Sequence, residues 1–407
     1  MRILIISQYF PPETGGPPNR MLSVARSLQK HGHDVTVVAE KPNHPEGVIR
    51  GGYRGGLFDR RTFDGIPVLY TWVYTRPDKN FVTRLAFYLS FMVMSVVGAA
   101  RLKGDFDVVL ASSPPLFVGV SGWLAARLHE AKFVFDVRDI WPEVAVAMGE
   151  LDNPALIRLA EGLERFLYDR ADGITAVTDS FCQHIRGKVG ETTPMARIMN
   201  GTMPDVFNQD DCRDEIRNRL DANDQFVVAY AGNHGLAQGL DHVIGAADRL
   251  RDRDVTFLML GSGPVKNDLV RDARQRNLDN ILFRDRVPLD EAAAHMAAAD
   301  ALLVPLADHE IYQQFIPSKL FDSMASARPV LLSVDGEARS ILEEAQAGLY
   351  YPAEDAGALA DSVEWLVDHP EERAEMGERG RAYAHDNCTR EAQAHEMVRF
   401  LERLTVD

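Results

Sequence analysis

The residues around Lys319 have the types and the spacing to hold a phosphorylated ligand. Pro317 fits the first turn of a helix, because its missing N–H is not needed at that position. The N–H groups of Ser318 and Lys319 then lie at a helix N-terminus, where anions bind readily, and Lys319 adds a full positive charge. One turn further on, the carboxylate of Asp322 can accept two hydrogen bonds from a diol. The spacing therefore suits a sugar nucleotide, and the alternative is an ordinary capped surface helix.

A second candidate loop, Gln8–Arg20, follows the first apolar strand and contains Gly15 and Gly16. Adjacent glycines before a helix allow a ligand to approach the backbone closely, and the helix N-terminus favours an anion. A purely structural turn is the alternative. The loop does not have the G-x-G-x-x-G pattern, and Glu40 matches the ribose-binding acid of dinucleotide enzymes by position only, so a nicotinamide enzyme is a minor alternative.

Alternating strands and helices must position both loops. Near-continuous apolar strands separated by helices are typical of parallel sheets that are covered on both faces. The pattern begins again after Asn200-Gly201, so we expect two doubly wound α/β domains with ligands at the carboxyl ends of the strands. The expected strands are Arg2–Phe10, Asp34–Glu40, Val108–Ser112, Phe133–Val137, Gly173–Thr178, Phe226–Gly232, Val255–Gly261, Ile281–Arg284, Ala301–Pro305 and Pro329–Val334.

The repeated pattern also predicts the domain boundaries. We expect residues 1–200 to form an N-terminal domain and residues 201–388 to form a C-terminal domain, each large enough for a sizeable core. The last helix, 389–407, follows the completed second pattern, and we expect it to pack back on the N-terminal domain.

Composition argues against several classes of protein. The chain has 407 residues, and its formal net charge of −16 argues against general binding to nucleic acid. Its three cysteines, Cys182, Cys212 and Cys388, fit neither a disulfide framework nor a zinc site, which favours a reducing cytoplasm. The N-terminus runs directly into a strand, which predicts that no signal peptide is present.

In their order and spacing, several segments resemble a retaining glycosyltransferase of family 4. The resemblance covers essentially the whole chain, and the transferases of capsule, O-antigen and exopolysaccharide assembly are the most similar by pattern. It implies the GT-B architecture, in which two facing Rossmann-like domains enclose an interdomain cleft. The segments are Gly15-Gly16, Asp136–Glu143, Asn200-Gly201, Tyr230–Asn233, Gly261–Pro264 and Pro317–Asp322.

The resemblance implies roles for individual residues, and this chain departs from the family at several of them. The family's glutamate pair falls on Gln314 and Asp322, so only Asp322 keeps a carboxylate for the ribose. An arginine and a lysine of many relatives fall on Asn233 and Gln238. The diphosphate therefore loses two cationic partners, which places more demand on Lys319.

Arg138 and Asp139 occupy the segment in which many relatives carry a histidine near the transferred sugar, and this chain has no histidine there. We expect Arg138 to supply a cation from the facing domain, and the alternative is a buried structural ion pair. The implied catalytic residues are Arg138, Asp139 and Lys319, and the implied donor-binding residues are Gly15, Gly16, Asn233, Gln238, Gln314, Pro317, Ser318, Lys319 and Asp322.

The implied reaction is transfer of a hexosyl group from a nucleotide sugar, with UDP favoured, to a hydroxyl of a lipid-linked or polysaccharide acceptor. The departing diphosphate develops negative charge, which N–H dipoles and a cation stabilise, so the family mechanism needs neither a cofactor nor a metal. Two alternatives remain open. A UDP-sugar 2-epimerase shares the GT-B fold, although it should bring a histidine to the sugar, and a non-catalytic nucleotide-sugar-binding protein would keep the fold without the chemistry.

Residues 45–103 are basic and apolar in an otherwise acidic chain. The sixteen uncharged residues 85–100 are fewer than the ~20 that span a bilayer. The segment suits an anionic membrane surface, so we expect peripheral association with the inner face of the cytoplasmic membrane, and a buried helix of the first domain is the alternative. The basic residues are Arg50, Arg54, Arg60, Arg61, Arg76, Lys79, Arg84, Arg101 and Lys103.

Overall fold

The computed structural model divides the chain into two compact units, which are described separately here. Unit 1 comprises Met1–Asn200 and Arg390–Asp407, and unit 2 comprises Gly201–Thr389. The structure describes residues 1–407 with the exception of residues 45, 78–79, 191, 210–211 and 407. The side chains of Phe81 and Val406 are also outside the described part. Lys79, one of the expected basic residues, therefore lies outside the described part of the chain.

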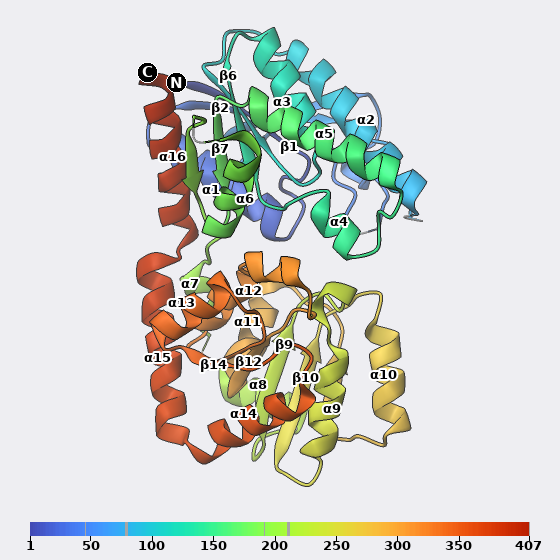
Figure 1. Ribbon diagram of the computed structural model, residues 1–407, viewed down its shortest axis with the longest axis vertical. Helices are drawn as coiled ribbons and strands as arrows, with labels where there is room; N and C mark the ends of the chain where they lie inside the picture. Colours follow the sequence, from blue (N-terminus) through green and yellow to red (C-terminus); the bar gives the residue numbers. More distant parts are fainter. Residues whose placement is uncertain (45, 78–79, 191, 210–211, 407) are drawn as a thin grey trace. The chain divides into compact units, whose positions relative to one another are not determined.

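Unit 1 contains an eight-stranded sheet in the order β3-β4-β2-β1-β5-β6-β7-β8, in which only β3 and β4 pair antiparallel (Figure 1). The strands are β1 (Arg2–Ser7), β2 (Asp34–Glu40), β3 (Phe58–Phe63), β4 (Ile66–Thr71), β5 (Val108–Ser112), β6 (Lys132–Val137), β7 (Gly173–Ala176) and β8 (Met195–Arg197). The helices are α1 (Gly16–Lys30), η1 (Gly51–Tyr53), α2 (Phe81–Ala100), α3 (Phe117–Leu128), α4 (Glu143–Ala147), α5 (Pro154–Arg170), α6 (Asp179–Val189) and α16 (Arg390–Val406).

The last helix of the chain belongs to the core of unit 1. Met397, Val398 and Leu401 of α16 are fully buried and join the hydrophobic cluster that contains Ile3 of β1 and Met21 of α1. Helix α16 packs against α1 in this unit. Hydrophobic burial of its apolar side therefore holds the C-terminal segment to a domain whose other elements come from the first half of the chain.

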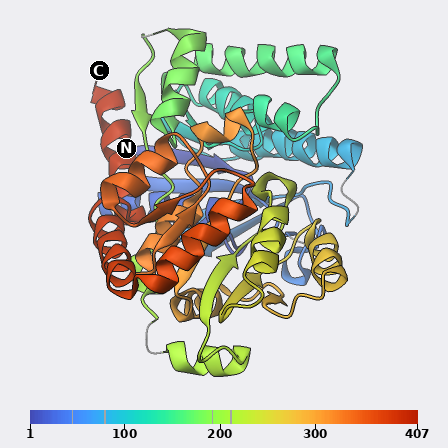
Figure 2. The same cartoon turned by 60° about the horizontal axis from the view of Figure 1, so that its bottom comes forward.

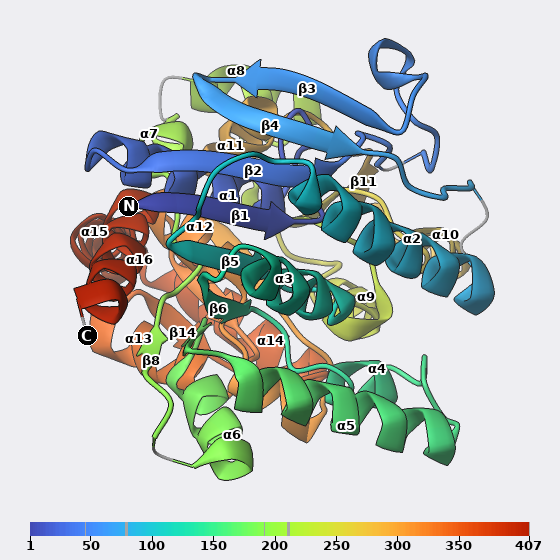
Figure 3. The same cartoon turned by 90° about the horizontal axis from the view of Figure 1, so that it is seen from above.

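The segment between β2 and β5 contains a β-hairpin that the sequence analysis missed. Strands β3 and β4 form this hairpin, and β4 then pairs parallel with β2. Helix α2 follows and packs against α3, β2 and β4, and Figure 3 shows α2 beside α3. The polar residues of β3 hid the strand, because an exposed edge strand carries no continuous apolar pattern.

Helix α2 is longer than the uncharged segment 85–100, and much of its surface is exposed. It has 20 residues, and its segment Val82–Ala100 is long and apolar enough to cross a membrane by length and composition. Only 22% of that segment is buried, and the side chains of Val82, Val93 and Val97 are 71%, 54% and 40% exposed. The alternative of a wholly buried helix is therefore not met, because just one side of α2 is covered by its own unit.

Unit 2 contains a six-stranded parallel sheet in the order β11-β10-β9-β12-β13-β14 (Figure 1, Figure 2). The strands are β9 (Phe226–Ala231), β10 (Val255–Leu260), β11 (Ile281–Arg284), β12 (Ala301–Val304), β13 (Val330–Leu332) and β14 (Gly348–Tyr350). The helices are α7 (Pro204–Phe207), α8 (Arg213–Leu220), η3 (Leu236–Gln238), α9 (Asp241–Arg249), α10 (Lys266–Gln275), α11 (Leu289–Ala298), η4 (Glu310–Gln314), α12 (Ser318–Ala325), α13 (Glu337–Ala345), α14 (Ala356–Asp368) and α15 (Pro370–Asn387).

Both sheets have the doubly wound topology, as the sequence predicted. The strand order reverses beside β1 in unit 1 and beside β9 in unit 2, and ligands of such sheets bind outside the carboxyl ends at these points. The loop with Gly15 and Gly16 follows β1, and the loop with Asn233 follows β9. The expected site loops therefore lie at the reversal point of each sheet.

Candidate functional site

The ammonium group of Lys319 lies against Tyr230 at the carboxyl end of β9. Lys319 Nζ donates to Tyr230 Oη at 2.5 Å and lies 4.1 Å from the centroid of the tyrosine ring. Tyr230 is fully buried, and its hydroxyl donates to the backbone oxygen of Asn233 at 2.5 Å. Burial lowers the pKa of Lys319 to about 7, although the carboxylate of Asp322 raises it. The lysine is therefore fixed in place, but it has no carboxylate within ion-pair distance among the described residues.

Glycines allow the backbone to come close to this lysine. A Cβ atom on Gly232, whose φ is +155°, would lie 2.3 Å from Lys319 Nζ, so only glycine leaves room for the ammonium group. The loop after β10 packs on the same turn, where a Cβ on Gly261 would collide with the carbonyl oxygen of Gly232. The glycines of the two motifs therefore serve close backbone packing around Lys319.

His234 lies behind the lysine and was not expected from the sequence. Its side chain is fully buried, its ring lies 5.6 Å from that of Tyr230, and neither ring nitrogen has a hydrogen-bond partner among the described residues. Burial lowers its pKa to about 4, and the cations of Lys266 and Lys319 lower it further. The ring is therefore neutral. This buried ring has no exposed surface with which to contact a sugar, so it is not the histidine that an epimerase would bring to the sugar.

Helix α12 begins at Ser318, with Pro317 as its N-cap. The N–H groups of Ser318 and Lys319 have no acceptor four residues earlier in the helix, so they can bind an anion. Asp322 lies one turn later and is half-buried, and its Oδ1 accepts a hydrogen bond from Thr202 Oγ1 at 2.7 Å. The phosphate-binding and diol-binding groups of the sequence analysis thus lie on one short helix of unit 2.

Other predicted donor-binding residues hold the loop together. Gln238 Oε1 accepts the backbone N–H of Gly235 at 3.1 Å and so caps the short helix η3. Asn233 is exposed at the tip of the loop, and Gln314 ends helix η4 half-buried. Asn233 therefore remains accessible to a ligand, whereas the side chain of Gln238 already has a structural role.

In unit 1, the loop after β1 offers a weaker anion site than the sequence predicted. Gly15 is the N-cap of α1 with φ +130°, and Gly16 is the first helical residue. Pro17 and Pro18 follow and have no N–H to donate. A Cβ at either glycine would meet no atom within 4 Å in this structure, so the glycines leave open space above the loop.

Arg138 and Asp139 follow β6 and do not pair with each other within ion-pair distance among the described residues. Arg138 Nε donates to the backbone oxygen of Ser113 at 2.8 Å, and burial lowers the pKa of its guanidinium to about 10. Asp139 Oδ1 is buried and accepts no hydrogen bond from a described residue. Burial raises the pKa of Asp139 to about 6, while Arg138 lowers it. The structural ion pair is instead formed by their neighbour Asp136.

Asp136 forms a fully buried ion pair with Arg20 of α1. Arg20 Nη2 lies 3.0 Å from Asp136 Oδ1, and the two side chains are 4% and 0% exposed. Ser112 and Thr175 also donate to the carboxylate, each at 2.8 Å. Arg20 further donates to the backbone oxygens of Ile198 and Met199. The pair thus connects α1, the strand ends and the last residues of unit 1.

Glu40 has a structural role rather than that of a ribose-binding acid. It is 1% exposed, and its two carboxylate oxygens accept from Gln8 Nε2 and Asn43 Nδ2, each at 2.8 Å. A dinucleotide ribose cannot reach this carboxylate in the structure, so the nicotinamide alternative loses the residue on which it depended.

One cluster in unit 1 has ligand types that can bind a metal. Single ligand atoms of Glu143, Glu164 and His184 lie within 4.8 Å of one another. However, Lys188 Nζ lies 2.6 Å from Glu143 Oε1 and 2.5 Å from Glu164 Oε2. Burial disfavours the charged carboxylate, but hydrogen bonds from His184 and Lys188 hold the pKa of Glu143 at about 2. A cation would have to displace Lys188, so the cluster is a buried ion-pair network.

Two family models match the chain one after the other. The model described as "Glycosyl transferase 4-like domain" matches residues 15–201, and that described as "Glycosyl transferases group 1" matches residues 212–383. The chain is a group 1 glycosyltransferase of family 4. The resemblance inferred from the motifs is thereby confirmed, and this hexosyltransferase-type enzyme transfers a sugar from a nucleotide-sugar donor.

Individual relatives of this glycosyltransferase are distant. It is 26% identical over 340 residues to the putative colanic acid biosynthesis glycosyl transferase WcaI of Escherichia coli K12, which covers 80% of this chain and 81% of the relative. It is 24% identical to a GDP-mannose-dependent phosphatidylinositol monomannoside mannosyltransferase of Mycolicibacterium smegmatis, over 97% and 98% of the two chains. The structure of Anabaena HepE with UDP-glucose matches with a TM-score of 0.74 at 16% identity, over 99% and 100% of the chains, and this likeness shows the GT-B fold.

Asp322 provides a test of the diol site of the glycosyltransferase. We expect Asp322→Asn to weaken nucleotide binding roughly 10-fold and to change kcat little, because the charged acceptor of a hydrogen bond is lost while the amide oxygen remains. Calorimetric titration with the nucleotide measures the effect. Thr202→Val is the control, since it removes only the hydroxyl that donates to Asp322 Oδ1. An equal loss of affinity in both variants would show that Asp322 acts only on local structure.

The lowered pKa of Lys319 predicts that donor binding depends on pH. Since its pKa is about 7, the glycosyltransferase must take up a proton to bind a diphosphate at higher pH. We therefore expect little change in affinity below about pH 7 and a loss approaching tenfold per pH unit above it. Of the groups beside the ammonium group, His234 has its pKa lowered to about 4 and Tyr230 has its pKa raised by burial, so neither accounts for a titration near pH 7.

Calorimetry with a UDP-sugar measures this dependence, because its doubly esterified diphosphate does not titrate in that range. Lys319→Arg is the control, since a guanidinium stays charged throughout. The same pH slope in the wild type and in the arginine variant would assign the titration to another group.

Proposed function

We propose that this glycosyltransferase retains the anomeric configuration and transfers a hexosyl group from a UDP-sugar to a hydroxyl of a lipid-linked or polysaccharide acceptor in cell-surface glycan assembly. The observation that carries the proposal is the Lys319 site of unit 2. There, a half-buried ammonium group is fixed by Tyr230 and lies at the N-terminus of α12.

The site supports this chemistry through the leaving group. When the anomeric C–O bond breaks, negative charge develops on the diphosphate, and a cation that is already in place stabilises it without reorganisation. Lys319 and the first N–H groups of α12 supply this stabilisation, and Asp322 would hold the ribose. In retaining members the departing phosphate takes the proton of the attacking hydroxyl, so no separate base is required in unit 2.

The relatives support the proposed class of acceptor, and they leave UDP and GDP to be compared as the nucleotide of the donor. WcaI is named for colanic acid biosynthesis and HepE was solved with UDP-glucose, whereas the mycobacterial relatives are named as GDP-mannose-dependent. Thermal stabilisation of the purified protein by a panel of UDP-, GDP- and ADP-sugars tests the donor, because a bound ligand raises stability by mass action. Stabilisation by GDP-sugars alone would contradict the UDP assignment.

Product analysis separates transfer from the two alternative functions. A 2-epimerase would convert the stabilising UDP-sugar without an acceptor, and a non-catalytic binding protein would neither transfer nor hydrolyse it. The transferase should release UDP slowly alone and faster with a lipid-linked or oligosaccharide acceptor. An epimerised sugar would overturn the proposal.

We also propose that the enzyme associates peripherally with the inner face of the cytoplasmic membrane through residues 45–103. The exposed side of α2 supports this, since Val82, Val93 and Val97 lie on one face of the helix and are exposed. Sedimentation with anionic vesicles tests the association. An absence of binding even at low salt would refute it.

A further inference from the structure

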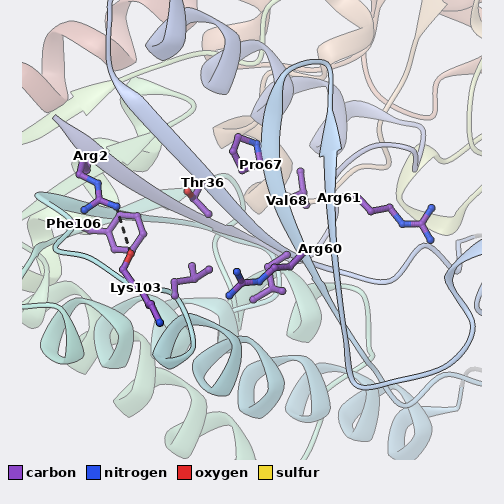
Figure 4. Close-up of a pocket in the computed structure, with 10 residues that line it drawn as sticks. Arg2, Thr36, Arg60, Arg61, Pro67, Val68, Lys103 and Phe106 are labelled. Carbon is purple, nitrogen blue, oxygen red and sulfur yellow. Dashed lines mark hydrogen bonds between the residues drawn. The ribbon is translucent and has the colours of Figure 1, made fainter.

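A basic hollow of about 410 Å³ lies at the edge of the first sheet that is opposite the site loops (Figure 4). Arg2 is the first residue of β1 and Thr36 lies near the start of β2, so the hollow faces the amino ends of these parallel strands. Arg60 and Arg61 of β3 and Lys103, which follows α2, also line it. The hollow is therefore separate from the Gly15-Gly16 loop at the carboxyl ends.

Three of the four cations that line this hollow have no carboxylate partner among the described residues, whereas the fourth, Arg61, pairs with Asp59. Arg2 donates to the backbone oxygen of Lys103 at 3.5 Å and lies 5.4 Å from the centroid of the Phe106 ring. Arg60 donates to the backbone oxygen of Arg101 at 3.3 Å. Among the described residues, no side-chain carboxylate lies within ion-pair distance of Arg2, Arg60 or Lys103, although Asp107 accepts the backbone N–H of Arg2. Their positive charges are therefore available to an anion.

A glycine adapts the backbone to one of these arginines. Gly104 has φ +103°, and a Cβ atom there would lie 2.3 Å from Arg2 Nη1. The guanidinium thus lies directly on the backbone after α2, where a larger residue would displace it. The exposed guanidinium of Arg2 therefore packs against the backbone of this turn.

The hollow lies close to the C-terminal end of α2, one side of which is exposed and apolar. Val93 and Val97 are one helical turn apart on that side, and the helix ends at Ala100, three residues before Lys103. Arg60 donates to the first carbonyl group beyond the helix. Apolar surface and unpaired cations therefore meet at the C-terminal end of α2, which is the combination that binds an anionic lipid surface.

We propose that this hollow binds the phosphate group of an anionic phospholipid headgroup while the exposed side of α2 contacts the lipid. The proposal rests on the membrane association proposed above. Arg2 and Arg60 offer planar N–H donors that match phosphate oxygens, Lys103 adds charge, and the half-buried hydroxyl of Thr36 is a further donor. A free phosphorylated compound has the same chemistry, so the test includes it as a separate arm.

The test compares two variants in sedimentation with vesicles of phosphatidylglycerol and of phosphatidylcholine. The double variant Arg60→Gln/Lys103→Gln removes two cations of the hollow. The control is Arg26→Gln/Lys30→Gln, because these two cations lie on α1, outside the hollow and outside residues 45–103, and pair with Asp64 and Glu391. We expect the double variant to bind phosphatidylglycerol vesicles at least about tenfold more weakly than the wild type, and the control to bind nearly as well.

The possible outcomes separate the membrane association, the headgroup site and the binding of a free phosphate compound. Wild-type protein that binds no vesicle contradicts the membrane association itself. Wild-type binding that the double variant retains overturns only the headgroup site, as does an equal loss in the control. Stabilisation of the wild type by inorganic phosphate or glycerol 3-phosphate, lost in the double variant while vesicle binding is unchanged, would assign the hollow to a free phosphate compound and overturn the lipid assignment.

Discussion

Lys319→Ala is expected to reduce kcat/KM for sugar transfer by about 10²–10³-fold or more, because it removes a preorganised cation from the leaving diphosphate. The loss should be larger than in relatives that carry additional cations in the loop after β9, since this chain has Asn233 and Gln238 there. Steady-state kinetics with a fixed acceptor and varied donor measures the effect. Wild-type activity in this variant would show that the diphosphate binds elsewhere.

The fold should survive this substitution. Burial disfavours the ammonium form of Lys319, as its pKa of about 7 indicates, so its removal is not expected to lower the melting temperature. Tyr230→Phe is the matched variant, because it keeps the ring but removes the hydroxyl that accepts from Lys319 Nζ. We expect an intermediate loss of activity, about tenfold, with the pH dependence of donor binding altered. A large drop in melting temperature for Lys319→Ala would instead indicate a structural role.

Asp136→Ala is expected to destabilise unit 1 by about 3–5 kcal/mol, because it leaves the buried guanidinium of Arg20 without its counterion. Differential scanning calorimetry of the full chain measures the change as a shift of the transition to which unit 1 contributes. Burial alone would raise the pKa of Asp136, but Arg20 holds it below the usual value. The contribution of the pair should therefore be present above about pH 4 and be lost as the pH falls further.

Asp64→Ala is the control for this prediction. Asp64 pairs with Arg26, but their side chains are 47% and 51% exposed, so the substitution should cost less than about 1 kcal/mol. The double variant Arg20→Met/Asp136→Leu should be less damaging than Asp136→Ala, because it leaves no buried charge. Equal effects of Asp136→Ala and Asp64→Ala would show that the buried pair contributes little.

The fold class followed from the sequence because its signal is local and strong. The runs at Asp34–Glu40, Val108–Ser112 and Ile281–Arg284 are strands with those same bounds in the structure. A buried parallel strand must be apolar throughout, so its composition alone reveals it. Strand β3 was missed because this edge strand is mostly polar, whereas β4 is apolar and buried, and its composition could have predicted it.

The placement of several expected donor-site residues also followed from local sequence. Pro317, Ser318, Lys319 and Asp322 lie on one helix, so their relative placement follows from helical spacing. The contact between Lys319 and Tyr230 of β9 could not be predicted from helical spacing, because the two residues are 89 positions apart in the chain. The sequence placed Gly232 in a motif but did not explain why glycine occurs there. The structure explains it, because the side chain of Lys319 lies directly over this residue.

By itself, the sequence determined the two doubly wound sheets, the family, and the presence of Lys319 and Asp322 one turn apart on α12. The tertiary structure decided which charged groups are paired. It placed Asp136 rather than Asp139 in the buried ion pair with Arg20, and it left one side of α2 exposed beside an unpaired group of cations. The physical reason is that strand and helix formation depend on neighbours along the chain, whereas pairing, burial and pKa depend on residues that only folding brings together.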